Sequence, residues 1–111
     1  MISPSHSKTS PEHARRALTA IEIEAHLAQA PGWSLNQEGP AWAIEKTYAF
    51  ANYYETMAFV NALAFIAHAH NHHPDLSVHY QRCGVRLSTH DVGGLSAADF
   101  DCASRYDALL A

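Results

Sequence analysis

Histidine is the residue type in this sequence that is best suited to chemistry. The chain has nine histidines among 111 residues, and six of them lie between positions 68 and 90: His68, His70, His72, His73, His79 and His90. An unperturbed imidazole has a pKa of about 6.5, so it can donate or accept a proton near neutral pH, and it is also a common metal ligand. The cluster therefore predicts either acid/base catalysis or metal binding.

Helix geometry bears on the choice between these two chemistries. Successive residues of an α-helix turn by about 100°, so His68 and His72 would share a face if a helix reached His72, while His70 would point away. Such a pair could chelate a metal, but a metal site needs further ligands and groups that orient them. The chain offers no cysteine or glutamate at a recognisable metal spacing. We predict no metal ligand, and a histidine metal site stays as an alternative.

The first half of the chain predicts a helix and a β-hairpin. Thr19 has a side chain suited to an N-cap, residues 21–30 have helical composition, and Pro31-Gly32 ends the run. Residues 33–37 and 42–48 carry aromatic or branched side chains at alternating positions and flank a Glu-Gly-Pro turn. We expect these two segments to pair as antiparallel strands.

A long second helix is predicted over residues 53–70. Its apolar side chains recur at spacings of three and four, which makes one stripe of Tyr53, Met57, Val60, Ala64 and Ala67. Proline cannot continue a helix and disfavours helical geometry in the residue before it, so Pro74 predicts an end near Asn71 or His72. The neighbouring histidines should therefore straddle the end of this helix.

The last third of the chain predicts a second pair of strands and a closing helix. Residues 76–80 and 85–89 are short alternating runs. A Gly-Gly pair then breaks the chain, and Ser96 with Asp99 three residues later approximates a capping box that opens a helix to residue 109. The predicted order is α-β-β-α-β-β-α, an α+β fold in which helices cover one face of a four-stranded antiparallel sheet.

Length and composition predict one folded domain behind a flexible tail. Apolar residues make up 48% of the chain and charged residues 16%, which is enough to build a core. Residues 1–16 lack apolar periodicity, so we predict a flexible N-terminal tail there and a single domain over residues 17–111. A domain of this size has a thin stability margin, which favours burial of further surface in a homodimer or homotetramer.

Charge, hydropathy and cysteine content argue against several classes of partner. The net charge of −4 and a pI near 6.1 leave no basic footprint for nucleic acid. The longest apolar stretch, residues 57–67, is too short to cross a membrane. Cys83 and Cys102 lack CxxC spacing and are expected to be buried thiols. We expect a cytoplasmic protein that binds neither nucleic acid nor membrane.

The spacing of the histidines resembles a family signature. His68-xxx-His72-His73-Pro74, followed by Tyr80, His90 and Asp99, matches the pattern of the pterin-4a-carbinolamine dehydratases without a gap. The chain departs from the pattern at its first place, where His68 replaces the usual acidic residue. Further agreement lies in Gly32-Trp33 and in residues 88–96, so the resemblance covers the chain from about Ala17 to its end.

The resemblance implies an activity that needs no redox cofactor or metal. Members of this family dehydrate 4a-hydroxytetrahydrobiopterin, which aromatic amino acid hydroxylases leave behind, to quinonoid dihydropterin and water. By resemblance, His72 and His90 are the expected proton donors to the 4a-hydroxyl, and His73 would place the substrate and handle the N5 proton. These roles could be exchanged.

The resemblance also assigns supporting positions and leaves other classes of function open. The family's substrate-contacting stretches correspond to Asn71, Ser88, Thr89 and Asp91, and its supporting positions to His68, Tyr80 and Asp99. Asp99 could equally serve as a helix cap, and Trp33 either stacks on the pterin or belongs to the core. Some relatives are non-enzymatic assembly or dimerisation factors, which is the second reading besides the dehydratase. A functional link to a hydroxylase is expected for the enzyme.

Overall fold

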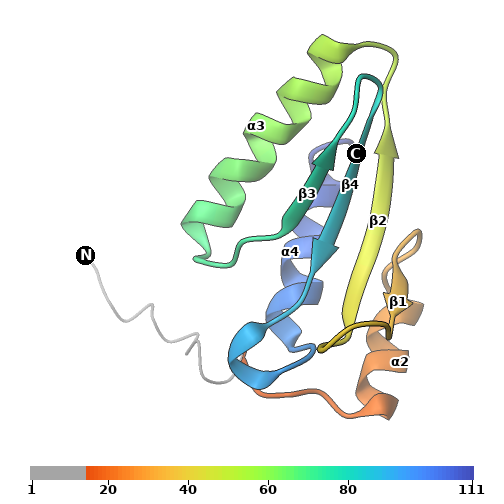
Figure 1. Ribbon diagram of the computed structural model, residues 1–111, viewed down its shortest axis with the longest axis vertical. Coiled ribbons are helices and arrows are strands. Elements are labelled where there is room, and N and C mark those ends of the chain that lie inside the picture. The colour runs from red at the N-terminus through yellow and green to blue at the C-terminus, as the bar shows by residue number, and fades with distance from the viewer. Residues whose placement is uncertain (1–14) are drawn as a thin grey trace.

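The computed structural model describes residues 15–111, so residues 1–14 of the tail predicted over residues 1–16 lie outside the described residues. The elements follow one another as α2 (Ala20–Ala28), β1 (Ser34–Asn36), β2 (Ala43–Ala49), α3 (Tyr53–Ala69), β3 (Asp75–Val78), β4 (Arg82–Leu87), the 3₁₀ turn η2 (His90–Val92) and α4 (Ala97–Ala108). Figure 1 shows this arrangement. The predicted α+β order is confirmed, and η2 is an additional short turn.

The four strands form one antiparallel sheet in the order β1-β2-β4-β3. Strand β4 lies in the centre, where Ile44 of β2 faces Leu87 and Val78 of β3 faces Cys83. Strand β3 is an edge strand, and all four of its residues are exposed. The sheet therefore brings the end of β4 close to the segment that joins α3 to β3.

Alternation along the central strands separates a covered face from an open one. Ile44, Tyr48, Cys83, Val85 and Leu87 are each at most 5% exposed and form the core with the helices. Figure 1 shows α4 behind the sheet and α3 along its β3 side. Phe59 of α3 packs on Tyr48 with ring centroids 4.5 Å apart, so α3 shares the covered face. The opposite face is hollowed by a depression of about 350 Å³.

Two of the helix starts were correctly predicted from their capping residues. Thr19 caps α2 and Ser96 caps α4, each through a complete capping box, with Glu22 and Asp99 at the third helical position. These boxes satisfy backbone N–H groups that a helix end otherwise leaves without partners.

The buried stripe of α3 differs from the predicted one. The buried residues are Thr56, Phe59, Leu63 and Ala67, while Tyr53 and Ala64 of the predicted stripe are exposed. Thr56 is polar, yet its hydroxyl bonds to the carbonyl oxygens of Asn52 and Tyr80, which allows full burial. A stripe that includes a hydrogen-bonded threonine is missed when only apolar residues are counted.

Helix α3 also ends earlier than predicted. Its last residue is Ala69 and His70 is its C-cap, while Asn71 has a φ of 49° in the left-handed region. Asparagine is one of the few side chains that tolerates this conformation at a helix end. The chain therefore leaves the helix before His72, and His68 and His72 do not share a helix face.

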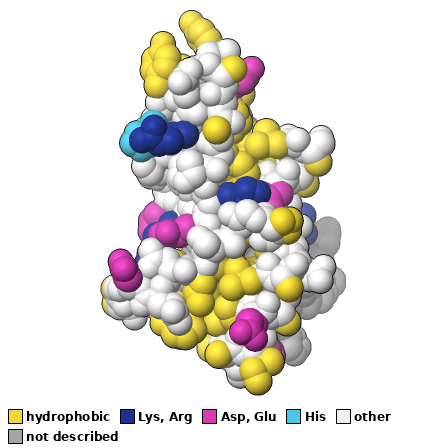
Figure 2. All heavy atoms as spheres, turned by 90° about the vertical axis from the view of Figure 1, so that its right-hand side faces the viewer, with side chains coloured by type: hydrophobic (Ala, Val, Ile, Leu, Met, Phe, Trp, Pro, Cys, Tyr) yellow, Lys and Arg dark blue, Asp and Glu magenta, His cyan; other side chains and the backbone are white. Residues whose placement is uncertain are grey.

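The surface carries charges of both signs. Figure 2 shows lysine, arginine and acidic side chains interspersed on one face of the molecule, with no basic patch on that face. Within residues 15–111, no helix is both long and apolar enough to cross a membrane. Cys83 and Cys102 are buried free thiols, as expected.

Candidate active site

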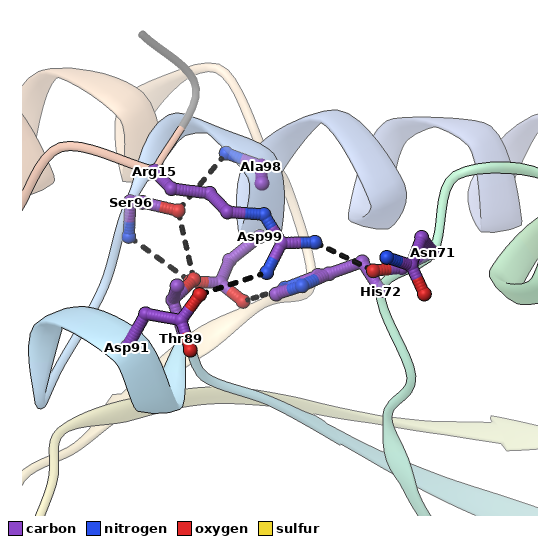
Figure 3. A network of polar contacts seen from close by, with 8 residues as sticks. All are labelled: Arg15, Asn71, His72, Thr89, Asp91, Ser96, Ala98 and Asp99. Carbon is purple, nitrogen blue, oxygen red and sulfur yellow. Dashed lines mark hydrogen bonds and ion pairs between the residues drawn. The ribbon is translucent and has the colours of Figure 1, made fainter. Parts of the chain in front are cut away.

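His72 leaves the helix end and points into the protein, where it meets Asp99. Its Nε2 lies 2.6 Å from Asp99 Oδ1, and the two side chains are only 6% and 0% exposed. One comes from the segment after α3 and the other from the first turn of α4 (Figure 3). A buried carboxylate is costly unless donors surround it, so the surroundings of Asp99 decide what this pair can do.

Asp99 accepts hydrogen bonds from three donors, and these bonds determine which group donates in the small network around it. Besides His72, its Oδ2 accepts from the Thr89 hydroxyl at 2.7 Å and from the Ser96 N–H at 3.0 Å. Thr89 Oγ1 and Ser96 Oγ are 2.7 Å apart, and Ser96 Oγ accepts from the Ala98 N–H at 3.3 Å. Because the Thr89 proton is directed at Asp99, the Ser96 hydroxyl donates to Thr89. Figure 3 shows this chain of contacts.

The network determines which ring nitrogen of His72 carries a proton. A carboxylate accepts but does not donate, so the Nε2 that contacts Asp99 carries a proton. In the neutral imidazole, Nδ1 is then an acceptor; in the charged form, it is a second donor. A buried carboxylate that fixes one tautomer and one ring orientation is a recurring way to prepare a histidine for proton transfer.

The network joins the two chain segments that carry the other candidate histidines. His73 follows His72, and His90 follows Thr89 at the start of η2; both are exposed. Thr89 is fixed from the other side by a two-way backbone pairing with Gly94. The site thus has a buried, oriented imidazole with two exposed ones beside it in the chain.

The predicted contact residues fall into different environments. Thr89 is fully buried, so its side chain holds Asp99. Ser88 is half-buried, whereas Asn71 and Asp91 are exposed. Asp99 caps α4, which is one of the two readings made from the sequence, and its other oxygen contacts His72.

Arg15 contacts two of the predicted site residues, Asn71 and Asp91, and was not predicted to do so from the sequence. Its guanidinium donates to the Asn71 carbonyl oxygen at 2.5 Å and lies 3.5 Å from the Asp91 carboxylate (Figure 3). The sequence placed Arg15 at the end of the tail, where no apolar periodicity indicates structure. An arginine before a helix carries no local signal for a contact with a residue 56 positions away.

Three residues considered from the sequence lie away from the network. Tyr80 is 72% exposed and stacks on Tyr53 at the opposite end of α3, with ring centroids 5.4 Å apart. His68 is exposed in the last turn of α3. Trp33 is in the core, and its indole N–H donates to Asp107. The structure therefore does not bring these side chains to His72.

Asp107 organises a second polar cluster that is separate from the candidate site. It accepts from Trp33, from Lys46 Nζ at 2.8 Å and from the Tyr48 hydroxyl at 2.5 Å. Burial, reinforced by Asp107, raises the pKa of Tyr48 far above its usual value. These bonds tie the end of α4 to β2 and give Trp33 a structural role.

The described residues contain no group of three or more histidine, cysteine, aspartate or glutamate side chains placed to hold a metal ion. His72, the most buried of the clustered histidines, has its Nε2 committed to Asp99. The arrangement found around His72 is one that suits proton transfer.

Relatives and solved structures agree on one family. The family model described as "Pterin 4 alpha carbinolamine dehydratase" matches residues 16–109. A protein of Paracidovorax citrulli, named as a candidate pterin-4-alpha-carbinolamine dehydratase, is 67% identical over 89% of this chain and 85% of its own length. A protein of the same name from Stenotrophomonas maltophilia is 61% identical over 75% of this chain and 70% of its own.

Two solved structures have the same fold. A transcriptional coactivator/pterin dehydratase from Brucella melitensis superposes with a TM-score of 0.81, at 26% identity, over 86% of this chain and 100% of the other. A pterin dehydratase-like protein identified as a RuBisCO assembly factor has a TM-score of 0.59, at 29% identity, over 70% and 88% of the two chains. With the family model spanning nearly the whole described domain, the chain belongs to the pterin-4a-carbinolamine dehydratases, which are hydro-lyases.

Proposed function

We propose that this protein dehydrates 4a-hydroxytetrahydrobiopterin to quinonoid dihydropterin by histidine acid/base catalysis, in the recycling of tetrahydropterin. The observation that carries the proposal is the bond between His72 and the buried Asp99, beside the exposed His73 and His90. Family membership supplies the reaction class.

The reaction requires only the movement of protons. The C4a–O bond breaks, and the hydroxyl leaves as water once an acid has protonated it. The N5 proton goes to a base, and the N5 electron pair forms the new N5=C4a double bond. Electrons and atoms balance without an oxidant or reductant, so groups that titrate near neutral pH are sufficient.

His72 and His90 are the proposed donors to the departing hydroxyl, and His73 places the ring and handles the N5 proton. His72 acts through Nδ1, because its Nε2 is engaged by Asp99. The Asp99 carboxylate stabilises the imidazolium whenever His72 holds two protons. His73 and His90 are exposed and can reach a flat bicyclic substrate from different directions. Asn71, Ser88 and Asp91 are proposed to contact the pterin edge.

The test is the decay of freshly made 4a-hydroxytetrahydropterin with wild type, His73→Ala and buffer. We expect wild type to accelerate the decay, and His73→Ala to lose about 10²- to 10⁴-fold. His73 is exposed, so the substitution leaves the core intact. His70→Ala is the matched control, because it removes a neighbouring exposed imidazole that has no proposed role. Equal decay in all samples would reject the catalytic assignment.

A non-enzymatic assembly role is the competing reading, since one solved relative is a RuBisCO assembly factor. The presence of all three candidate catalytic histidines favours the enzyme. A correctly folded wild-type protein without dehydratase activity would favour the assembly role instead.

We also propose that the chain forms a homo-oligomer through the open edge of β3. All four residues of this edge strand are exposed, including Leu76 at 37% and Val78 at 42%. An unprotected edge with apolar side chains is suited to pairing with the same strand of a second copy. Light scattering after size exclusion should show a dimer or tetramer, and Val78→Pro should lower the mass, because the Val78 N–H faces away from β4, on the open side of the edge. A monomeric wild type would contradict this.

The proposed setting is the cytoplasm, in functional partnership with an aromatic amino acid hydroxylase that produces the substrate. Buried free thiols at Cys83 and Cys102 are consistent with a reducing compartment. Purification of the protein from its host with and without the hydroxylase would test whether the link is a physical complex.

A further inference from the structure

Arg15 contacts both segments that carry the candidate catalytic histidines. Its Nη2 donates to the carbonyl oxygen of Asn71, which precedes His72, and its Nη1 lies 3.5 Å from the carboxylate of Asp91, which follows His90. Figure 3 shows the guanidinium between these two residues. A single side chain thus joins the segment after α3 to η2.

The Asn71 contact lies just beyond the end of α3. The helix dipole favours a cation near the C-terminal end of a helix, and Asn71 directly follows the C-cap His70. Asn71 is in the left-handed conformation with a φ of 49°, and its carbonyl oxygen accepts from Arg15. Arg15 therefore fixes the backbone immediately before His72.

The ion pair between Arg15 and Asp91 matters little for folding, because its Asp91 side is exposed. The Arg15 side chain is 23% exposed and that of Asp91 is 71% exposed, and ion pairs in water contribute little to stability. The guanidinium is planar, however, and presents donors in fixed directions, so it can set the spacing of two partners. The geometry favours a role in positioning.

We infer that Arg15 is a positioning residue: it clamps Asn71 to Asp91 and so sets the distance between the His72–His73 pair and His90. The inference rests on the proposed function, because the spacing matters only if these histidines act on one substrate. Small displacements of catalytic groups are costly, with losses of about 100-fold for a shift on the order of 1 Å.

The experiment compares wild type, Arg15→Ala, Arg15→Lys and Arg16→Ala. Arg16 is the matched control, because it is the adjacent arginine and bonds to Glu22 of α2. We expect kcat/KM to fall about 10- to 100-fold in Arg15→Ala, with kcat falling more than KM rises and with Tm almost unchanged. Arg15→Lys should recover part of the loss, and Arg16→Ala should behave as wild type.

Amide hydrogen exchange tests the clamp without using activity. The His72 N–H bonds to the Ala67 oxygen at 3.1 Å, and the Gly93 N–H bonds to the His90 oxygen at 3.0 Å. Both should exchange faster in Arg15→Ala. The Phe50 N–H, which bonds to the Gln81 oxygen far from Arg15, should keep its rate.

The two measurements separate the possible failures. If wild type has no dehydratase activity, the proposed function fails, and unchanged exchange at His72 and Gly93 would independently reject the clamp. If wild type is active but Arg15→Ala matches Arg16→Ala in kcat/KM, the positioning role is wrong, whatever the exchange rates.

Discussion

Asp99 combines two roles in one side chain. Its Oδ2 completes the capping box of α4 through Ser96, and its Oδ1 faces His72 at 2.6 Å. Because the carboxylate is fully buried, its orientation is set by donors within the protein. The start of α4 and the orientation of His72 therefore depend on the same group.

Asp99→Asn removes the negative charge of the side chain and keeps its shape. The amide oxygen can still accept from Thr89 and Ser96, so its NH₂ group would face His72 Nε2 and donate to it. The His72 proton would then move to Nδ1, which reverses the tautomer. We expect dehydratase kcat to fall about 10²- to 10⁴-fold with the fold retained, and imidazole ¹⁵N shifts to report the changed tautomer.

The control for this substitution is Asp101→Asn. Asp101 is an exposed neighbour on α4 that pairs with Arg105, so its loss removes the same charge without touching His72. An Asp99→Asn protein with wild-type kcat would show that the His72–Asp99 bond has no part in catalysis.

At the scale of elements, the two capping boxes allow a matched comparison. Thr19 and Ser96 cap α2 and α4 in the same way, but only Ser96 is linked to Thr89 and the His72 network. Alanine at either cap should cost about 1 kcal/mol, which corresponds to a fall in Tm of roughly 4–8 °C. Only Ser96→Ala should also reduce dehydratase activity, because Thr89 loses its donor.

Calorimetry and the dehydration assay on both variants would check this. A Thr19→Ala protein that loses as much activity as Ser96→Ala would mean that activity follows stability alone. Wild-type activity in Ser96→Ala would mean that Thr89 holds Asp99 without help.

The elements show which parts of the fold the sequence could reveal. Caps are local, and Thr19 and Ser96 were correctly identified from a few neighbouring residues. The buried face of α3 was not correctly identified, because apolar side chains also lie on its exposed side: Tyr54 is 85% exposed and Phe65 is 79% exposed. Residue type therefore could not indicate which face meets the sheet.

The candidate site likewise has residues that the sequence indicated and residues that it did not. The spacing of the histidines and Asp99 indicated the family, but the sequence did not predict the contact between His72 and Asp99 that the structure shows. Tyr80 shares the pattern but lies at the far end of α3, and Arg15 joins the site without belonging to any motif. Contacts between distant segments depend on where α3 ends, which the left-handed Asn71 decides.

At the scale of the whole molecule, the core holds two cysteine thiols and two tyrosine hydroxyls that lose their protons only at high pH. Burial raises the pKa of Cys102 from 9.0 to about 11, and burial likewise raises the pKa values of Cys83, Tyr48 and Tyr106. Their neutral forms are favoured in the folded state, which therefore binds more protons than the unfolded chain above about pH 9. Their contribution to stability is fully present below that pH and is lost as pH rises through the folded-state pKa values.

Alkaline stability should therefore decline through a defined window. For Cys102, the decline should lie between pH 9 and about 11, the unfolded and folded pKa values. We expect urea unfolding of wild type to show a falling free energy across this window, and Cys102→Ala to show a shallower fall because it lacks one of these groups. Alanine also removes buried volume and lowers stability at every pH, so the comparison uses the slope with pH. Parallel slopes for the two proteins would contradict a raised pKa at Cys102, since the proton that the folded state retains would then belong to other groups.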